Sequence, residues 1–170
     1  MEMLISTLTE IEAGWQHSGQ VLESGEKLGH DEQHPLNRFM AHSVVHFVCE
    51  TFMGSTAGAQ DVLRSVGLEP AAQELDSILA KKVGGHSLKT FLEEGRNTTV
   101  AHPTFDPKHV LNRVFDPASL EDPIVEGHYR SALGEFMKTV RIVHVLLRKL
   151  YPLAAASADL PWQPADKSPS

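Results

Sequence analysis

The chain has 170 residues, 41% of them hydrophobic, and a formal net charge of −7. This length and composition are ordinary for one soluble globular domain with a buried core. No run of about 18 apolar residues is present, which excludes a transmembrane helix, and the negative charge argues against broad electrostatic binding of nucleic acid.

Apolar residues in the first third of the chain recur at steps of three and four, which is typical of helices. The spacing predicts one helix over residues 4–28 and a second over residues 36–53, with Pro35 suited to the first turn of the second helix. The second segment carries apolar residues on two faces. We therefore expect it to be a central helix that is packed on both sides.

Shorter helices are predicted in the middle of the chain, over residues 59–66 and from Pro70 to Val83. Ser87 is a good N-cap for the next helix. That helix should continue to Ala101 or His102, because the proline that follows disfavours helical geometry in the residue before it.

After a short helix predicted over residues 106–115 and a proline-bracketed loop, the strongest pattern in the chain begins. Its apolar residues recur in steps of four and three over more than three heptads, which predicts a long core helix of a bundle or a share in a helical dimer interface. They are Val125, Tyr129, Leu133, Phe136, Val140, Val143, Leu147 and Leu150.

The predicted fold class is therefore all-α. We expect a helical bundle of four or five main helices plus short helices, because no segment shows the alternation of a strand. Residues 1–152 should form this single domain. Residues 153–170, rich in proline, alanine and serine, are expected to be a poorly ordered tail.

Candidate chemistry lies at the end of the helix that Ser87 begins. Arg96 is permanently charged and can bind phosphate in a bidentate way, and Asn97 can orient a phosphate or an imidazole by hydrogen bonding. His102 can donate or accept a proton near neutral pH. If the nucleophile is a ribose 2′-hydroxyl, these three groups could cleave RNA without a metal ion or another cofactor.

Helical geometry limits this interpretation. Residues six apart on a continuous helix point about 120° away from each other. Arg96 and His102 therefore share a site only if the backbone departs from the helix, or if a second copy of the chain supplies the facing motif across a two-fold axis.

The motif formed by Arg96, Asn97 and His102 resembles the signature of the HEPN superfamily. That signature is an arginine, a polar residue and, a few positions later, a histidine, on a late helix of an α-helical bundle. The resemblance implies an all-helical homodimer whose paired motifs line a cleft that takes RNA or a nucleotide. Many members are metal-independent endoribonucleases that act as toxins, with an antitoxin partner, or in defence. Others are inactive and bind nucleotides or RNA.

Other interpretations remain open. Arg96 could pair with Glu93 or Glu94 and merely complete the helix, in a non-catalytic binding or adaptor module. His42, His46 and Cys49 share one helical face and could hold zinc or a related metal, with His30, His34 or Glu50 among the candidates for a fourth ligand. The same histidines could also be structural, or His42 or His46 could face the same cleft as Arg96 and assist there.

The expected location is the cytoplasm, because Cys49 is the single cysteine and no secretory signal is visible. No contact with a membrane is expected.

Overall fold

The computed structural model describes residues 1–28, 35–54, 58–83, 85–97 and 123–160, and the structural statements that follow concern this part of the chain. It is all-α, as predicted, apart from one short strand pair. The helices are α1 (Glu2–Leu28), α2 (Pro35–Phe52), α3 (Ala59–Ser65), α4 (Glu69–Ala80), α5 (Leu88–Gly95), α7 (Pro123–Leu150) and α8 (Pro152–Ala158); the strands are β1 (Lys82–Val83) and β2 (His86–Ser87).

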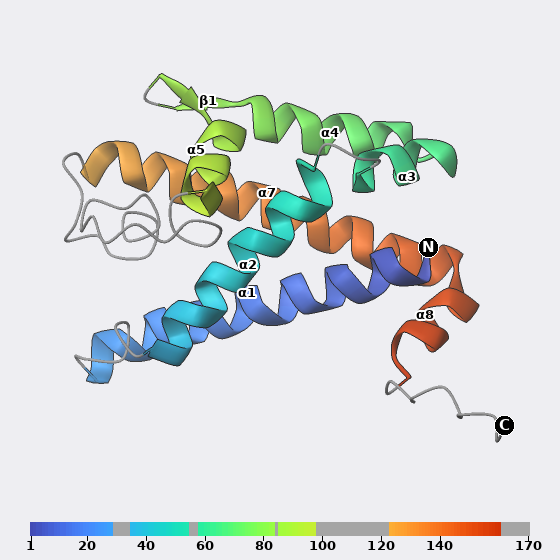
Figure 1. Cartoon of the computed structure of the whole chain (residues 1–170), viewed down its shortest axis with the longest axis horizontal. Coiled ribbons are helices and arrows are strands. Elements are labelled where there is room, and N and C mark those ends of the chain that lie inside the picture. Colours follow the sequence, from blue (N-terminus) through green and yellow to red (C-terminus); the bar gives the residue numbers. More distant parts are fainter. Residues whose placement is uncertain (29–34, 55–57, 84, 98–122, 161–170) are drawn as a thin grey trace, which may run out of the picture.

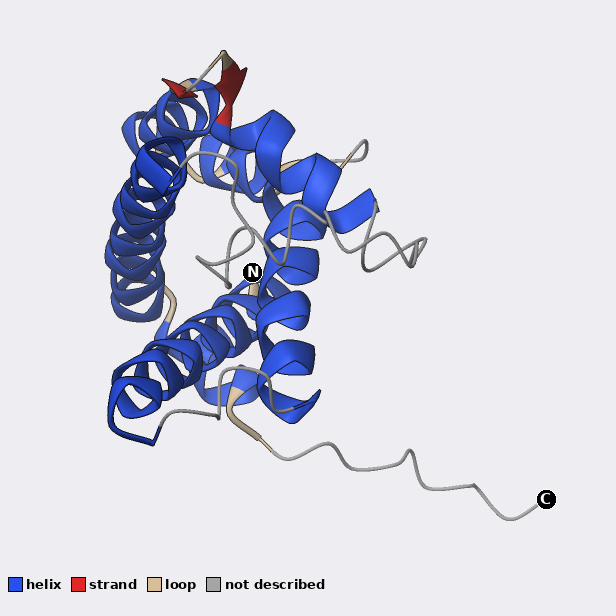
Figure 2. Cartoon of the chain, turned by 90° about the vertical axis from the view of Figure 1, so that its left-hand side faces the viewer, coloured by secondary structure: helices blue, strands red, loops and turns tan. Residues whose placement is uncertain are grey.

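The long helix α7 runs through the middle of the bundle, with α1 on one side and α4 on the other, and α2 crosses in front of it toward α3 (Figure 1). The antiparallel strand pair lies at one edge (Figure 2). None of the described helices is long and apolar enough to span a lipid bilayer.

The apolar seam of α7 is buried in the core of its own chain, which confirms the prediction of a core helix. Tyr129, Leu133, Phe136, Val140, Val143 and Leu147 are all buried, whereas Leu150 is exposed. Phe136 packs edge-on against Phe52 of α2, with ring centroids 5.1 Å apart. Because this seam is occupied within the chain, it is not free to form a dimer interface.

The helix that follows α3 ends earlier than the sequence indicates. It was expected to reach Val83, but α4 ends at Ala80, and β1 and β2 form a hairpin instead. Gly85 supplies a positive φ of 94°, which only glycine adopts at no steric cost. The Tyr129 hydroxyl donates a hydrogen bond to the Val83 carbonyl (2.6 Å), which ties this strand pair to α7.

The expected tail begins with an ordered helix. Residues 152–158 form α8, in which Ala155 is buried, and Arg148 forms an ion pair with Asp159 just beyond it. Alanine is the strongest helix former, and Pro152 stands in the first turn, where proline is tolerated. Residues 161–170 and the helix predicted over 106–115 lie outside the described residues.

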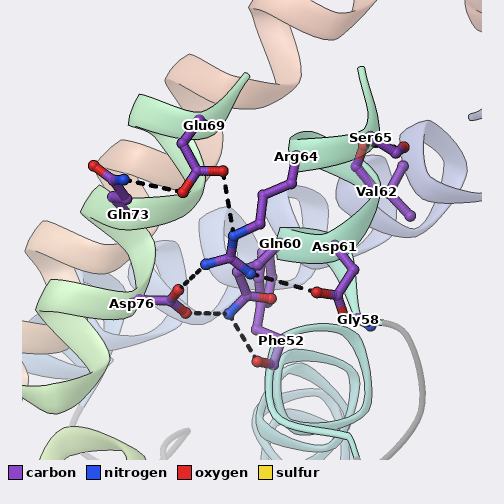
Figure 3. A network of polar contacts seen from close by, with 10 residues as sticks. All are labelled: Phe52, Gly58, Gln60, Asp61, Val62, Arg64, Ser65, Glu69, Gln73 and Asp76. Carbon is purple, nitrogen blue, oxygen red and sulfur yellow. Dashed lines mark hydrogen bonds and ion pairs between the residues drawn. The ribbon is translucent and has the colours of Figure 1, made fainter. Parts of the chain in front are cut away.

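Polar contacts hold α3, α4 and the end of α2 together (Figure 3). The Arg64 guanidinium bridges Glu69 and Asp76. Gln60, which is buried, donates to the Phe52 carbonyl (2.9 Å) and to Asp76 (3.1 Å). All of these groups satisfy one another, so this network is best explained as part of the scaffold.

Candidate functional site around Arg96

Helix α5 carries Arg96 and is fixed at its start by local sequence. Ser87 caps it as predicted, because its hydroxyl accepts a hydrogen bond from the Thr90 amide (3.0 Å). Leu88 and Leu92 are fully buried. A short amphipathic helix of this kind takes its position from the apolar face that it buries.

Two further contacts, an aromatic stack and a thiol hydrogen bond, fix α5 against its neighbours. Phe91 stacks on Tyr129 of α7, with ring centroids 4.0 Å apart and an interplanar angle of 8°. On the other side, the Cys49 thiol of α2 donates to the Leu92 carbonyl (3.5 Å). Helix α5 is thus held between α2 and α7, and these contacts determine where Arg96 lies.

The motif begins where α5 ends. Helix α5 ends at Gly95, and Arg96 and Asn97 form a π-type turn after it, in which Arg96 keeps right-handed helical dihedral angles (φ −58°, ψ −51°). The expected continuation of the helix to Ala101 or His102 lies outside the described residues, so the angle between Arg96 and His102 stays a prediction.

The guanidinium of Arg96 donates hydrogen bonds to the side-chain amide oxygen of Asn97 and to the carboxylate of Glu50. Its Nε–H and one Nη2–H donate to Oδ1 of Asn97 (3.1 and 3.0 Å), and one Nη1–H donates to Oε1 of Glu50 (3.0 Å). Arginine has five N–H donors, so one N–H on Nη1 and one on Nη2 have no acceptor among the described residues. The side chain is 23% exposed and is therefore oriented but reachable.

The acid that pairs with Arg96 is not one of the residues expected from the sequence. Glu50 lies on α2, 46 residues away, whereas Glu93 pairs with Lys89 at 3.9 Å. Glu50 is 54% exposed, so water screens this ion pair and its net contribution to stability is small. Asn97 also takes a different role: its Oδ1 orients the guanidinium, which leaves its amide N–H groups for other partners.

The alternative metal site is only partly within the described side chains. The side chain of His42 is outside them. Burial raises the pKa of the Cys49 thiol to about 12, although Arg96 acts in the opposite direction. A metal-binding cysteine is a thiolate, so a neutral thiol that donates to Leu92 favours a structural role for this residue. Among the described residues, no group of three histidines, cysteines or acids is placed to hold a metal ion.

His46 remains a buried polar group without an assigned partner. Its Nδ1 has no hydrogen bond among the described residues, and its ring lies 6.0 Å from that of Phe47. This position is consistent with the structural interpretation of the α2 histidines.

His102 lies in residues 98–122, outside the described part of the chain, and a single chain is described. The pairing of Arg96 with His102, and of one motif with a second copy, therefore stays a prediction. Comparisons with protein-family models, with curated proteins and with solved structures give no match for this chain.

Proposed function

We propose that this chain is a metal-independent endoribonuclease of the HEPN type, active as a homodimer in which two copies of the motif line one cleft. The proposal rests on Arg96, whose guanidinium is held by Asn97 and has two N–H groups without an acceptor among the described residues. One Nη1–H and one Nη2–H suit the two oxygens of a phosphate, which arginine binds in a bidentate way.

The reaction that fits these groups is transfer of a phosphoryl group within the RNA strand. The ribose 2′-oxygen attacks the neighbouring phosphorus, and the bond from phosphorus to the 5′-oxygen of the next nucleotide breaks. His102 would take the proton of the 2′-hydroxyl or return one to the leaving oxygen, and Arg96 would stabilise the charge on the phosphoryl oxygens. The products are a 2′,3′-cyclic phosphate and a 5′-hydroxyl.

A second candidate is a non-catalytic helical adaptor, and one observation favours it. Arg96 already has an anionic partner, because Glu50 joins the end of α5 to α2. In such a module the motif would simply complete a helix. Because the seam of α7 is buried, dimerisation through α7 would have to use its outer face, where Ile142 is 68% and Val145 is 51% exposed.

Cleavage of total RNA by purified protein separates the two candidates. We expect wild-type protein to produce fragments with 2′,3′-cyclic phosphate ends in the presence of a chelator. His102→Ala and Arg96→Ala should abolish this activity while far-ultraviolet circular dichroism stays unchanged. Lys89→Gln is the matched control, because it removes a cation with an ion pair on the same helix but outside the motif; it should leave cleavage unchanged.

Glu50→Gln gives the sharper test, because it removes the acid that competes with phosphate for Arg96. If Arg96 binds RNA, this variant should bind RNA more tightly by several-fold, with little loss of stability. If Arg96 serves only to join α5 to α2, Glu50→Gln and Arg96→Ala should destabilise the fold by similar small amounts and change nothing with RNA. Absence of cleavage by wild-type protein, together with that second pattern, would refute the ribonuclease proposal.

A further inference from the structure

A cavity of about 260 Å³ lies between α1 and α7, apart from the residues around Arg96. The start of α1 lies beside the end of α7, and the opposite ends of the two helices are far apart (Figure 1). Each helix contributes one stripe of residues at helical spacing to the walls. They include Glu12 and Trp15 from α1, and Gly134, Met137, Lys138 and Arg141 from α7.

Gly134 leaves one wall of this cavity without a side chain. A Cβ atom built on it would meet no heavy atom within 4 Å, so packing does not require glycine at this position. Glycine in a helix interior lowers helix stability relative to alanine. The position thus bears a cost in helix stability that the packing around it does not explain, and the result is open space beside Trp15 and Met137.

The α7 wall of the cavity also carries positive charge. Lys138 is exposed and has no ion pair among the described residues. Arg141 is 70% exposed, and its Nε lies 3.8 Å from Oε1 of Glu12. From Phe136 to Leu150 the sequence contains no acidic residue. This half of α7 is therefore a local cationic surface on a chain whose net charge is −7.

Glu12 is the one acid among the described residues that line the cavity, and a buried histidine holds it in place. His144 is 5% exposed, and its Nδ1 contacts Oε2 of Glu12. Its Nε2 lies 3.1 Å from the Thr9 hydroxyl, which itself donates to the Ile5 carbonyl. The Glu12 carboxylate is thus engaged by His144 through Oε2 and lies near Arg141 through Oε1.

We propose that this cavity binds a small planar anion, namely one aromatic ring system that carries a carboxylate or a phosphate. The ring would lie against Trp15 and Met137, where aromatic stacking and apolar burial favour it. The anionic group would contact Lys138 and Arg141 through charge-assisted hydrogen bonds. The volume is just below the usual range for drug-sized ligands, about 300–1,000 Å³, and so suits one ring system. This site is independent of the proposed RNA cleavage.

Trp15 provides the readout. The chain has a second tryptophan, Trp162, so a Trp162→Phe background leaves Trp15 as the only reporter. Its fluorescence should be quenched saturably by nicotinate, by adenosine 5′-monophosphate, or by both. Quenching by only one of the two identifies the anionic group as carboxylate or as phosphate. Adenosine and inorganic phosphate serve as controls, because each supplies half of the proposed ligand and should bind at least about tenfold more weakly.

Two variants test the walls of the cavity. Gly134→Leu should fill it and abolish quenching, and circular dichroism and thermal unfolding check that its fold is intact. Arg141→Gln, at an exposed position with little risk to folding, should weaken binding about tenfold or more. No saturable quenching by either probe up to about 10 mM, equal binding of adenosine and its monophosphate, or unchanged affinity in folded Gly134→Leu would each overturn the proposal.

Discussion

Two glycines in the interiors of long helices should respond in opposite directions when each is replaced by alanine. Gly14 lies in α1 where that helix crosses α2, and a Cβ atom on it would lie 2.6 Å from Cγ2 of Val44. Gly134 lies in α7 beside the cavity, where a Cβ atom meets nothing within 4 Å. The two positions share a backbone conformation and differ only in what surrounds them.

The expected magnitudes follow from these contacts. Replacing a helical glycine by alanine favours the folded state by about 1 kcal/mol. Gly134→Ala should gain this amount in full. At Gly14 the new methyl group would come far inside the 3.5–4.0 Å at which carbon atoms attract. Val44 is buried and its β-branched side chain is stiff in a helix, so overpacking should cost roughly 1–3 kcal/mol. Gly14→Ala should therefore destabilise the protein by up to about 2 kcal/mol.

Urea unfolding followed by circular dichroism measures both changes, and the slope of the transition should stay constant if only stability is altered. For a chain of this length, 1 kcal/mol corresponds to about 2–4 °C in Tm. In a Val44→Ala background, Gly14→Ala should lose most of its cost, because the methyl group that it meets is gone. Equal shifts of the same sign for the two alanine variants, or no coupling between Gly14 and Val44, would refute this account of the helix crossing.

Two further predictions concern buried polar groups. Cys49, whose pKa is raised to about 12 by burial, should resist alkylation in the folded protein at neutral pH and react quickly in denaturant. The folded pKa of this thiol lies above its unfolded value of about 9, so its contribution to stability is complete below pH 9 and should fall as the pH rises toward 12. Urea unfolding at several pH values, with Cys49→Ala as the control, measures this change. His144→Leu should destabilise the protein by roughly 3–5 kcal/mol, because it removes the buried partner of the Glu12 carboxylate, which is only 16% exposed. Adding Glu12→Gln should restore part of that loss, and strict additivity of the two changes in unfolding free energy would contradict the proposed pair.

The candidate site shows where sequence patterns stop being informative. The chemistry of Arg96 and Asn97 can be recognised from residue types alone. Because the two residues are adjacent in the chain, a hydrogen bond between their side chains is also easy to expect. Glu50 could not have been chosen as the partner of Arg96, because it is 46 residues away and only the packing of α2 against α5 brings it close. The same packing makes Cys49 a hydrogen-bonded neutral thiol, whereas its spacing from His42 and His46 was equally suited to a metal ligand.

Local periodicity by itself determined the helical class, the seam of α7 and the cap at Ser87. Burial of an apolar stripe and satisfaction of free amides at a helix end depend on neighbours within a few residues. The tertiary structure alone decided that α4 gives way to a strand pair at Lys82, that residues 152–158 pack as α8, and that His144 meets Glu12 across 132 positions. Those outcomes depend on which helices cross and on how far apart they lie. The residue spacing along a single helix does not determine these contacts between helices.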